Sequence, residues 1–81
     1  MSHSRQEILD QTRKIINELF EIEENHLSED ARLYEDLDID SIDTVDLLIE
    51  LKRFTGKEIE AEAFINSKTL GDIVTVISDL E

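Results

Sequence analysis

The sequence contains no cysteine, no proline and no tryptophan, and only two glycines among its 81 residues. Without cysteine the chain can build neither a disulfide framework nor a thiolate metal site, so any thiol chemistry has to come from a group attached to it. Its two histidines, His3 and His26, are too few to indicate a metal cluster, and we expect both to be exposed polar residues. The composition therefore disfavours a disulfide-rich protein and a metalloenzyme.

Long apolar runs are also missing. No stretch approaches the ~18 consecutive apolar residues of a membrane-spanning helix. Residues 1–10 carry too many polar side chains for a signal peptide, so we expect a cytoplasmic protein without membrane insertion. The 81 residues can bury one small core and no second one, which predicts a single domain over residues 1–81.

Positive charge is scarce, since 21 acidic residues face only 8 lysines and arginines and the formal net charge is -13. Repulsion between like charges makes nucleic acid and anionic membranes poor partners. Basic protein surfaces are the natural partners of such a chain. Acidity also serves simply to keep a small protein in solution, so the placement of the charges has to decide between these roles.

Apolar residues with helical spacing occupy two long segments. Within residues 6–20, apolar side chains recur at intervals of three, four and seven, which predicts an amphipathic helix. Ser4 and Glu7 have the spacing of a capping box at the start of this helix. Residues 41–55 combine many apolar side chains with no glycine or proline, which predicts a helix packed on more than one side. Gly56 is suited to end that helix in the left-handed conformation.

The remaining segments are less regular. Residues 21–40 predict a long loop held by buried apolar anchors, namely Ile22, Leu27, Leu33, Tyr34 and Leu37. Residues 61–66 predict one or two helical turns with Phe64 and Ile65 pointing inward. Thr69 then caps a last helix whose buried stripe is Leu70, Ile73, Val74, Ile77 and Leu80. The sequence thus predicts an all-α four-helix bundle of three longer helices and one short helix, with a long loop between the first two.

Acidic residues concentrate in one segment, EDLDIDSIDTVDLLIE at residues 35–50, which contains no base. In the second predicted helix, Asp43, Asp46 and Glu50 fall on one face at spacings of three and four. Repulsion between neighbouring acids costs roughly a few tenths of a kcal/mol per pair, while Asp43 gains ~0.3–1 kcal/mol from the helix dipole, so the two effects nearly cancel. The stripe is no clear aid to stability, which makes a binding role worth considering.

Calcium binding is one such role, because Asp36, Asp38 and Asp40 match the opening positions of an EF-hand loop. The match then fails, since the sixth position needs glycine and is Ser41, and the twelfth needs glutamate and is Leu47. Taken alone, the Asp40-Ser41 pair indicates only a helix N-cap.

The wider stretch LYEDLDIDSIDTVDLLIELKRFTGKEI, residues 33–59, resembles the phosphopantetheine-attachment region of acyl carrier proteins. That family typically shows an acid and leucine, glycine, a variable residue, Asp-Ser-Leu, an acid and a Val-Glu-Leu element. The matching residues here are Asp36, Leu37, Asp38, Ile39, Asp40, Ser41, Ile42, Asp43, Val45, Asp46 and Leu47. Asp38 replaces the usual glycine and Ile42 the usual leucine, and the first change leaves open the loop shape and the transferase that accepts it.

The resemblance implies a non-catalytic acyl carrier protein. Ser41 would receive a covalent 4′-phosphopantetheine arm from coenzyme A through a separate phosphopantetheinyl transferase, which releases adenosine bisphosphate. The thiol of the arm would carry acyl intermediates as thioesters in fatty-acid biosynthesis or a related polyketide, polyene or lipid pathway. Some of the apolar side chains would shelter the acyl chain, although core packing is the simpler role for each of Ile42, Val45, Leu48, Phe54, Ile65 and Ile73.

Acidic residues would give this carrier its docking surface. The resemblance implies contacts with basic patches on the transferase and on acyl-loading and chain-extending enzymes, while the carrier itself stays a monomer. The residues assigned to docking are Asp36, Asp38, Asp40, Asp43, Asp46 and Glu50.

Two alternatives stay open. One is a carrier of D-alanine or another amino acid, and the other is an acidic helical adaptor that has no prosthetic group and uses Ser41 only as a cap. The acidic second helix favours the fatty-acid-like branch. Within that branch the sequence is more similar to specialised carriers of secondary or polyene pathways than to the housekeeping protein.

Overall fold

The computed structural model describes residues 3–80, and within that range the chain forms four α-helices, one short 3-10 helix and no strand. Met1, Ser2 and Glu81 lie outside the described residues. The helices are α1 (Arg5–Phe20), α2 (Ser41–Thr55), α3 (Ala61–Ile65) and α4 (Leu70–Leu80), and the 3-10 helix η1 spans Glu24–His26. The predicted all-α bundle of three longer helices and one short helix is confirmed.

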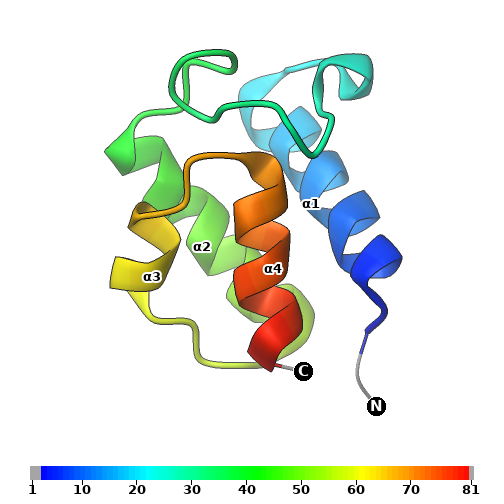
Figure 1. Ribbon diagram of the computed structural model, residues 1–81, viewed down its shortest axis with the longest axis vertical. Coiled ribbons are helices and arrows are strands. Elements are labelled where there is room, and N and C mark those ends of the chain that lie inside the picture. The colour runs from blue at the N-terminus through cyan, green and yellow to red at the C-terminus, as the bar shows by residue number, and fades with distance from the viewer. Residues whose placement is uncertain (1–2, 81) are drawn as a thin grey trace.

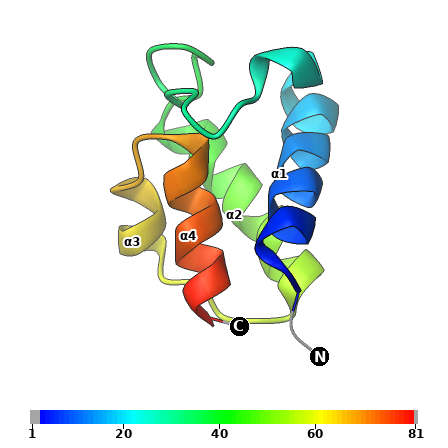
Figure 2. The ribbon, with the colours of Figure 1, turned by 45° about the vertical axis from the view of Figure 1, so that its right-hand side comes forward.

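The helices pack around one core. Helix α1 packs against α2 and α4, and the short α3 packs against α2 and α4 on the other side, as Figure 1 and Figure 2 show. The largest fully buried side chain is that of Phe64 in α3. Thr12 is also fully buried and remains compatible with the core because its hydroxyl donates to the Ile8 carbonyl at 2.7 Å.

The predicted helix ends are confirmed. Ser4 Oγ accepts from the Glu7 N–H at 3.1 Å, and the Ser4 N–H donates to Glu7 Oε1 at 3.1 Å, which completes a capping box. Gly56 ends α2 at φ 68°, a left-handed conformation that glycine adopts without a Cβ clash. At α4, Thr69 Oγ1 accepts from the Asp72 N–H at 3.1 Å.

The burial predicted for three of the helices is partly wrong. Ile42, Val45 and Ile49 of α2 are exposed, because α1 and α3 cover one side of this helix and leave the outer side to solvent. Ile65 is 51% exposed because α3 is a single short segment that turns only Phe64 into the core. Leu80 is exposed at the last position of α4, beyond the packed turns.

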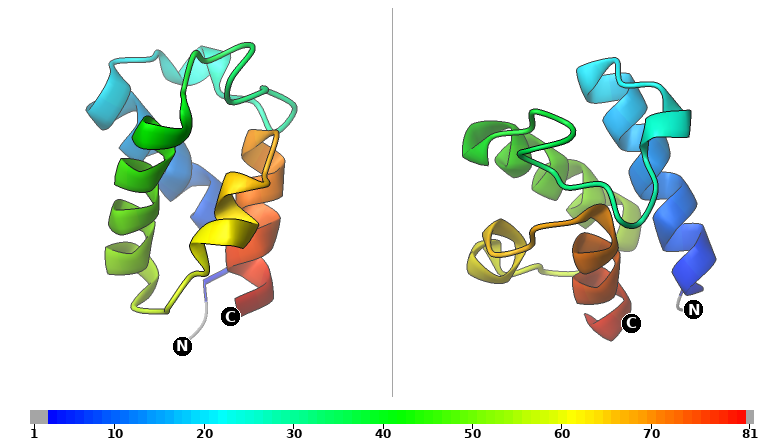
Figure 3. Two further views of the ribbon diagram at one scale, coloured as in Figure 1. Left: turned by 90° about the vertical axis from the view of Figure 1, so that its left-hand side faces the viewer. Right: turned by 45° about the horizontal axis from the view of Figure 1, so that its top comes forward.

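The connection of residues 21–40 crosses the end of the bundle at which α2 and α4 begin (Figure 3). Its main chain is joined to the start of α4, since the Gly71 N–H donates to the Glu29 carbonyl and the Leu70 N–H to the Ala31 carbonyl, both at 2.9 Å. A Cβ at position 71 would lie 3.1 Å from that Glu29 oxygen, so a larger residue would have to push the Glu29 main chain away, and the close approach favours glycine.

The anchors of this connection differ in part from the predicted set. Leu27, Leu33 and Leu37 are buried as predicted, and Ile22 is half-buried. Tyr34 is 71% exposed, so its prediction as an anchor is wrong; Ala31 and Ile39 are buried in the same connection. The Ile39 N–H donates to the Leu33 carbonyl at 2.8 Å, which folds the chain between them outward and carries Tyr34 into solvent.

Candidate functional site

Asp40 and Ser41 occupy different positions at the start of α2. Asp40 is the N-cap residue, and its Oδ1 accepts from the N–H groups of Ile42 at 3.0 Å and Asp43 at 2.9 Å. Ser41 is the first helical residue and is exposed. Its hydroxyl makes no hydrogen bond to any residue from 3 to 80. Because Asp40 satisfies the helix donors, the Ser41 hydroxyl is available for a reaction.

The backbone just before Ser41 adopts an uncommon conformation. Asp38 has φ 57°, in the left-handed region that favours glycine and, among other residues, tolerates aspartate and asparagine best. This explains why glycine is usual here and why aspartate is an acceptable replacement. The sequence left open which loop conformation forms with aspartate at position 38. In the structure, Asp38 itself adopts the left-handed conformation.

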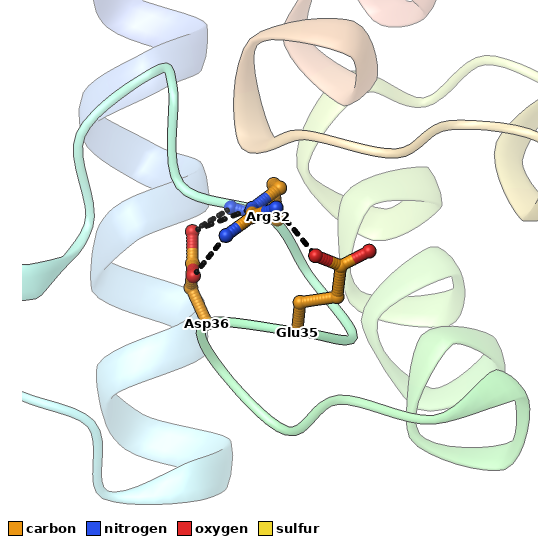
Figure 4. A network of polar contacts seen from close by, with 3 residues as sticks. All are labelled: Arg32, Glu35 and Asp36. Carbon is orange, nitrogen blue, oxygen red and sulfur yellow. Dashed lines mark hydrogen bonds and ion pairs between the residues drawn. The ribbon is translucent and has the colours of Figure 1, made fainter.

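An ion-pair network fixes the turn that precedes this position (Figure 4). Asp36 Oδ2 accepts from the Arg32 N–H at 2.9 Å, and the Arg32 guanidinium contacts both Asp36 and Glu35. The Arg32 N–H and then its guanidinium lower the pKa of Asp36, because both stabilise the ionised carboxylate. Asp36 thus holds the turn together.

A surface groove of about 390 Å³ opens beside Ser41. The connection before α2, the first turns of α2 and the link between α3 and α4 form its walls. Its lining combines apolar, polar and charged residues, namely Arg32, Leu33, Tyr34, Glu35, Ile39, Asp40, Ser41, Thr44, Ile65, Ser67 and Lys68. Of the residues suggested as shelter for an acyl chain, only Ile65 lines this groove. Leu48 and Ile73 are buried in the core, while Ile42 and Val45 face solvent.

A second cavity of about 550 Å³ lies in the 21–40 connection and is lined by Ile22, His26, Ser28, Asp30, Ala31, Asp36 and Leu37. Ser41 does not line it. Across residues 3–80 no group of three or more His, Cys, Asp or Glu side chains is arranged to hold a metal ion. His3, expected to be simply exposed, is half-buried with its ring centroid 4.3 Å from that of Phe54.

The six acids predicted for docking divide into two groups. Asp36 pairs with Arg32, Asp40 caps α2, and Glu50 contacts Arg53 at 3.5 Å. Asp38, Asp43 and Asp46 make no side-chain hydrogen bond or ion pair within the part of the chain that the structure describes. Asp46 is exposed on the outer side of α2 and Asp43 is half-buried.

Apolar side chains accompany these acids. Ile42, Val45 and Ile49 are exposed at spacings of three and four, each one position before an acid of the stripe, so the two rows run side by side along α2. Sequence reasoning assigned them to the core. Each of them directly precedes an acid of the stripe in the sequence. This spacing could have indicated that they lie on the same side of α2 as the acids.

The comparisons with known proteins agree with this geometry. A family model described as the phosphopantetheine attachment site matches residues 10–77. Acyl carrier protein 2 of Ralstonia nicotianae is 42% identical over 74 residues, which cover 91% of each chain. The acyl carrier protein of Thermotoga maritima is 35% identical over 74 residues, again 91% of each chain. The solved structure of the acyl carrier protein from Enterococcus faecalis has a TM-score of 0.81 and 30% identity, and the match covers 98% of this chain and 100% of that one.

Proposed function

Since this chain belongs to the acyl carrier protein family, which carries the phosphopantetheine attachment site, we propose that Ser41 is the residue that receives the arm. The observation that carries this proposal is the division of roles at the start of α2. Asp40 caps the helix, which leaves the Ser41 hydroxyl exposed and without a hydrogen bond to the described residues, at the edge of a groove. Ser41 is therefore not the residue that caps α2.

The modification is a phosphoryl transfer at Ser41 Oγ. The oxygen forms a new bond to the phosphorus that bears the pantetheine part of coenzyme A, the bond from that phosphorus to the adenosine bisphosphate breaks, and the serine proton leaves to a base. The Ser41 hydroxyl makes no hydrogen bond to a basic side chain among residues 3–80, so we assign the base and the metal ion to the transferase. The arm supplies a thiol that the cysteine-free chain lacks, on which acyl groups are held as thioesters.

The carrier's own residues supply recognition. The exposed carboxylates of α2, above all Asp46, attract basic patches on the transferase and on acyl-loading and chain-extending enzymes. Asp43 and Asp46 have no competing intramolecular partner among residues 3–80, whereas Asp36 and Asp40 are already engaged within the fold. We assign docking chiefly to Asp43 and Asp46, with Glu50 at the far end of the stripe.

The scope of the proposal is a non-catalytic carrier formed by one domain over residues 1–81, which serves fatty-acid biosynthesis or a related pathway. The helices of the described range include none that is long and apolar enough to cross a membrane.

Intact mass spectrometry tests the attachment site. The protein is incubated with coenzyme A, Mg²⁺ and a broad-specificity phosphopantetheinyl transferase, and the wild type is expected to gain the mass of one phosphopantetheine. Ser41→Ala should gain none, while Ser67→Ala, which changes another serine of the groove, should be modified like the wild type. A wild type that stays unmodified with several transferases would overturn the proposal and favour the acidic adaptor. A Ser41→Ala variant that is still modified would overturn it as well, because the arm would then be on another residue.

A further inference from the structure

An arm attached to Ser41 brings a negative charge into an acidic surrounding. The phosphodiester of the arm is an anion, and Asp38, Asp40 and Asp43 lie within three positions of Ser41 in the sequence. Two N–H groups at the helix start that could bind the anion, those of Ile42 and Asp43, already donate to Asp40. A cationic side chain that pairs with the phosphate would come from another part of the fold.

Two cationic residues line the groove beside Ser41, and they differ in what they already contact. The guanidinium of Arg32 contacts Glu35 and Asp36. Lys68 has no ion pair within 4 Å to any residue of the described range 3–80. Its charge acts weakly on Asp72, as the last of several influences that lower the pKa of that residue, after the hydrogen bonds from the Lys68 and Thr69 N–H groups.

The main chain holds Lys68 firmly in the wall of the groove. The Leu33 N–H donates to the Lys68 carbonyl at 2.9 Å, and the Lys68 N–H donates to Asp72 Oδ2 at 3.0 Å. The first bond joins the link before α4 to the connection that leads into Ser41, and the second joins that link to the first turn of α4. The Lys68 backbone is therefore held in place, and its flexible side chain lines the same groove as Ser41.

Apolar side chains flank the same groove. Tyr34 is 71% exposed and Ile65 is 51% exposed, and both line the groove together with Ser41 and Lys68. Exposed apolar surface of this kind matches the methyl-bearing part of a pantetheine chain, while Lys68 matches its phosphate. The groove thus offers a positive charge to the phosphate of the arm and apolar contacts to the pantetheine chain that follows it.

We propose that Lys68 is the counter-cation of the phosphodiester on Ser41 and acts as a positioning residue that directs the arm along the groove towards Tyr34 and Ile65. The inference rests on the proposed function, because it requires the arm on Ser41. It concerns where the arm lies on the carrier between visits to other enzymes. Without this contact the arm would project freely from the start of α2.

The test compares apo and holo forms of the wild type, Lys68→Gln and Lys68→Arg, with Lys57→Gln as a control that removes an exposed lysine elsewhere. The difference in thermal midpoint between holo and apo forms is expected to fall by about 2–4 °C in Lys68→Gln, as for an exposed ion pair in a domain of this size. Lys68→Arg and Lys57→Gln should keep the wild-type difference. The loss should shrink when about 0.5 M salt screens the pair.

A spectroscopic readout separates positioning from general stability. Conversion of the wild type to holo should shift the backbone amide signals of Ile65, Ser67 and Lys68, and Lys68→Gln should remove most of these shifts and move the ³¹P signal of the phosphodiester. Equal amide shifts and an equal midpoint difference in Lys68→Gln and the wild type would overturn the role of Lys68.

Intact mass distinguishes the two proposals. A wild type that gains the arm but shows no effect of Lys68→Gln overturns the positioning role alone. A wild type that never gains the arm overturns the proposed function, and the role of Lys68 with it.

Discussion

Asp40 accepts hydrogen bonds from the two backbone N–H groups that follow Ser41, so the residue before the proposed attachment serine caps the helix that this serine begins. The carboxylate oxygen Oδ1 takes both bonds, at 3.0 Å from Ile42 N and 2.9 Å from Asp43 N. Helix capping and the proposed modification thus depend on different residues. A substitution of Asp40 tests the cap, and a substitution of Ser41 tests the attachment site.

Asp40→Ala should lower the free energy of unfolding by about 1 kcal/mol, because it removes an N-cap side chain. Asp40→Asn keeps an oxygen acceptor and should stay within about 0.5 kcal/mol of the wild type. Ser41→Ala, the matched neighbour, should also change stability by less than about 0.5 kcal/mol, since it is exposed. Urea unfolding at neutral pH measures all three. Equal stability of Asp40→Ala and the wild type would show that Asp40 is not the cap.

Substitutions at Asp38 should rank by their tolerance of a positive φ. Asp38→Gly removes the strain of a non-glycine residue at positive φ, but it also increases the conformational entropy of the unfolded chain. Because each effect is about 1 kcal/mol and they oppose each other, the free energy of unfolding should stay nearly unchanged. Asp38→Val places a β-branched residue at a positive φ and should lower the free energy of unfolding by at least about 1 kcal/mol. Thermal unfolding checks the order. A valine variant as stable as the glycine variant would contradict the left-handed conformation.

Phe64 and Ile65 are neighbours with opposite surroundings. Phe64→Ala should destabilise by about 3–5 kcal/mol because it empties a fully buried site, and Phe64→Leu, which keeps most of the volume, provides a variant that still folds. Ile65→Ala should cost less than about 0.5 kcal/mol, since the side chain is 51% exposed. Chemical denaturation of the leucine and alanine variants measures the contrast, and a larger loss at Ile65 than at Phe64 would contradict the burial.

The ion pair of Asp36 predicts a pH dependence of stability. The folded state holds the pKa of Asp36 below its ordinary value of 3.8, so the stabilisation is complete above that value and is lost as the pH falls through the lower folded value. Asp36→Asn should therefore be less stable than the wild type at neutral pH, and the gap should close in acid. Denaturation across the acidic range measures this gap, and Arg32→Gln should show a smaller gap that also closes in acid, because it removes the guanidinium but keeps the backbone N–H that donates to Asp36. A gap that widens in acid would have the wrong sign.

Asp46 should control the rate at which a partner binds. Asp46→Lys is expected to slow association with a phosphopantetheinyl transferase by about two- to tenfold and to flatten its salt dependence, because an exposed charge on the docking face is reversed. Asp79→Lys makes the same change in net charge at the far end of α4 and serves as the control (Figure 1). Stopped-flow association at two salt concentrations decides, and equal rates for both variants would remove Asp46 from the docking surface.

Local signals determined much of the fold. Caps at Ser4, Thr69 and Gly56 and the apolar spacing along the chain were readable because they depend on residues within one or two turns of each other. The attachment motif around Ser41 is likewise contiguous, which is why it could be recognised before its geometry was known.

The tertiary structure decided which apolar side chains another element covers. A periodic pattern places Ile42 and Ile65 on apolar faces, but it cannot show that α2 and α3 leave them exposed, and Tyr34 likewise faces solvent. Nor can it show that Lys68, distant in sequence, lines the same groove as Ser41. The sequence alone determined the helices, their ends and the serine of the motif, because these depend on neighbouring residues. The exposed row on α2 and the cation beside Ser41 depend on contacts between distant segments, so only the packed chain could reveal them.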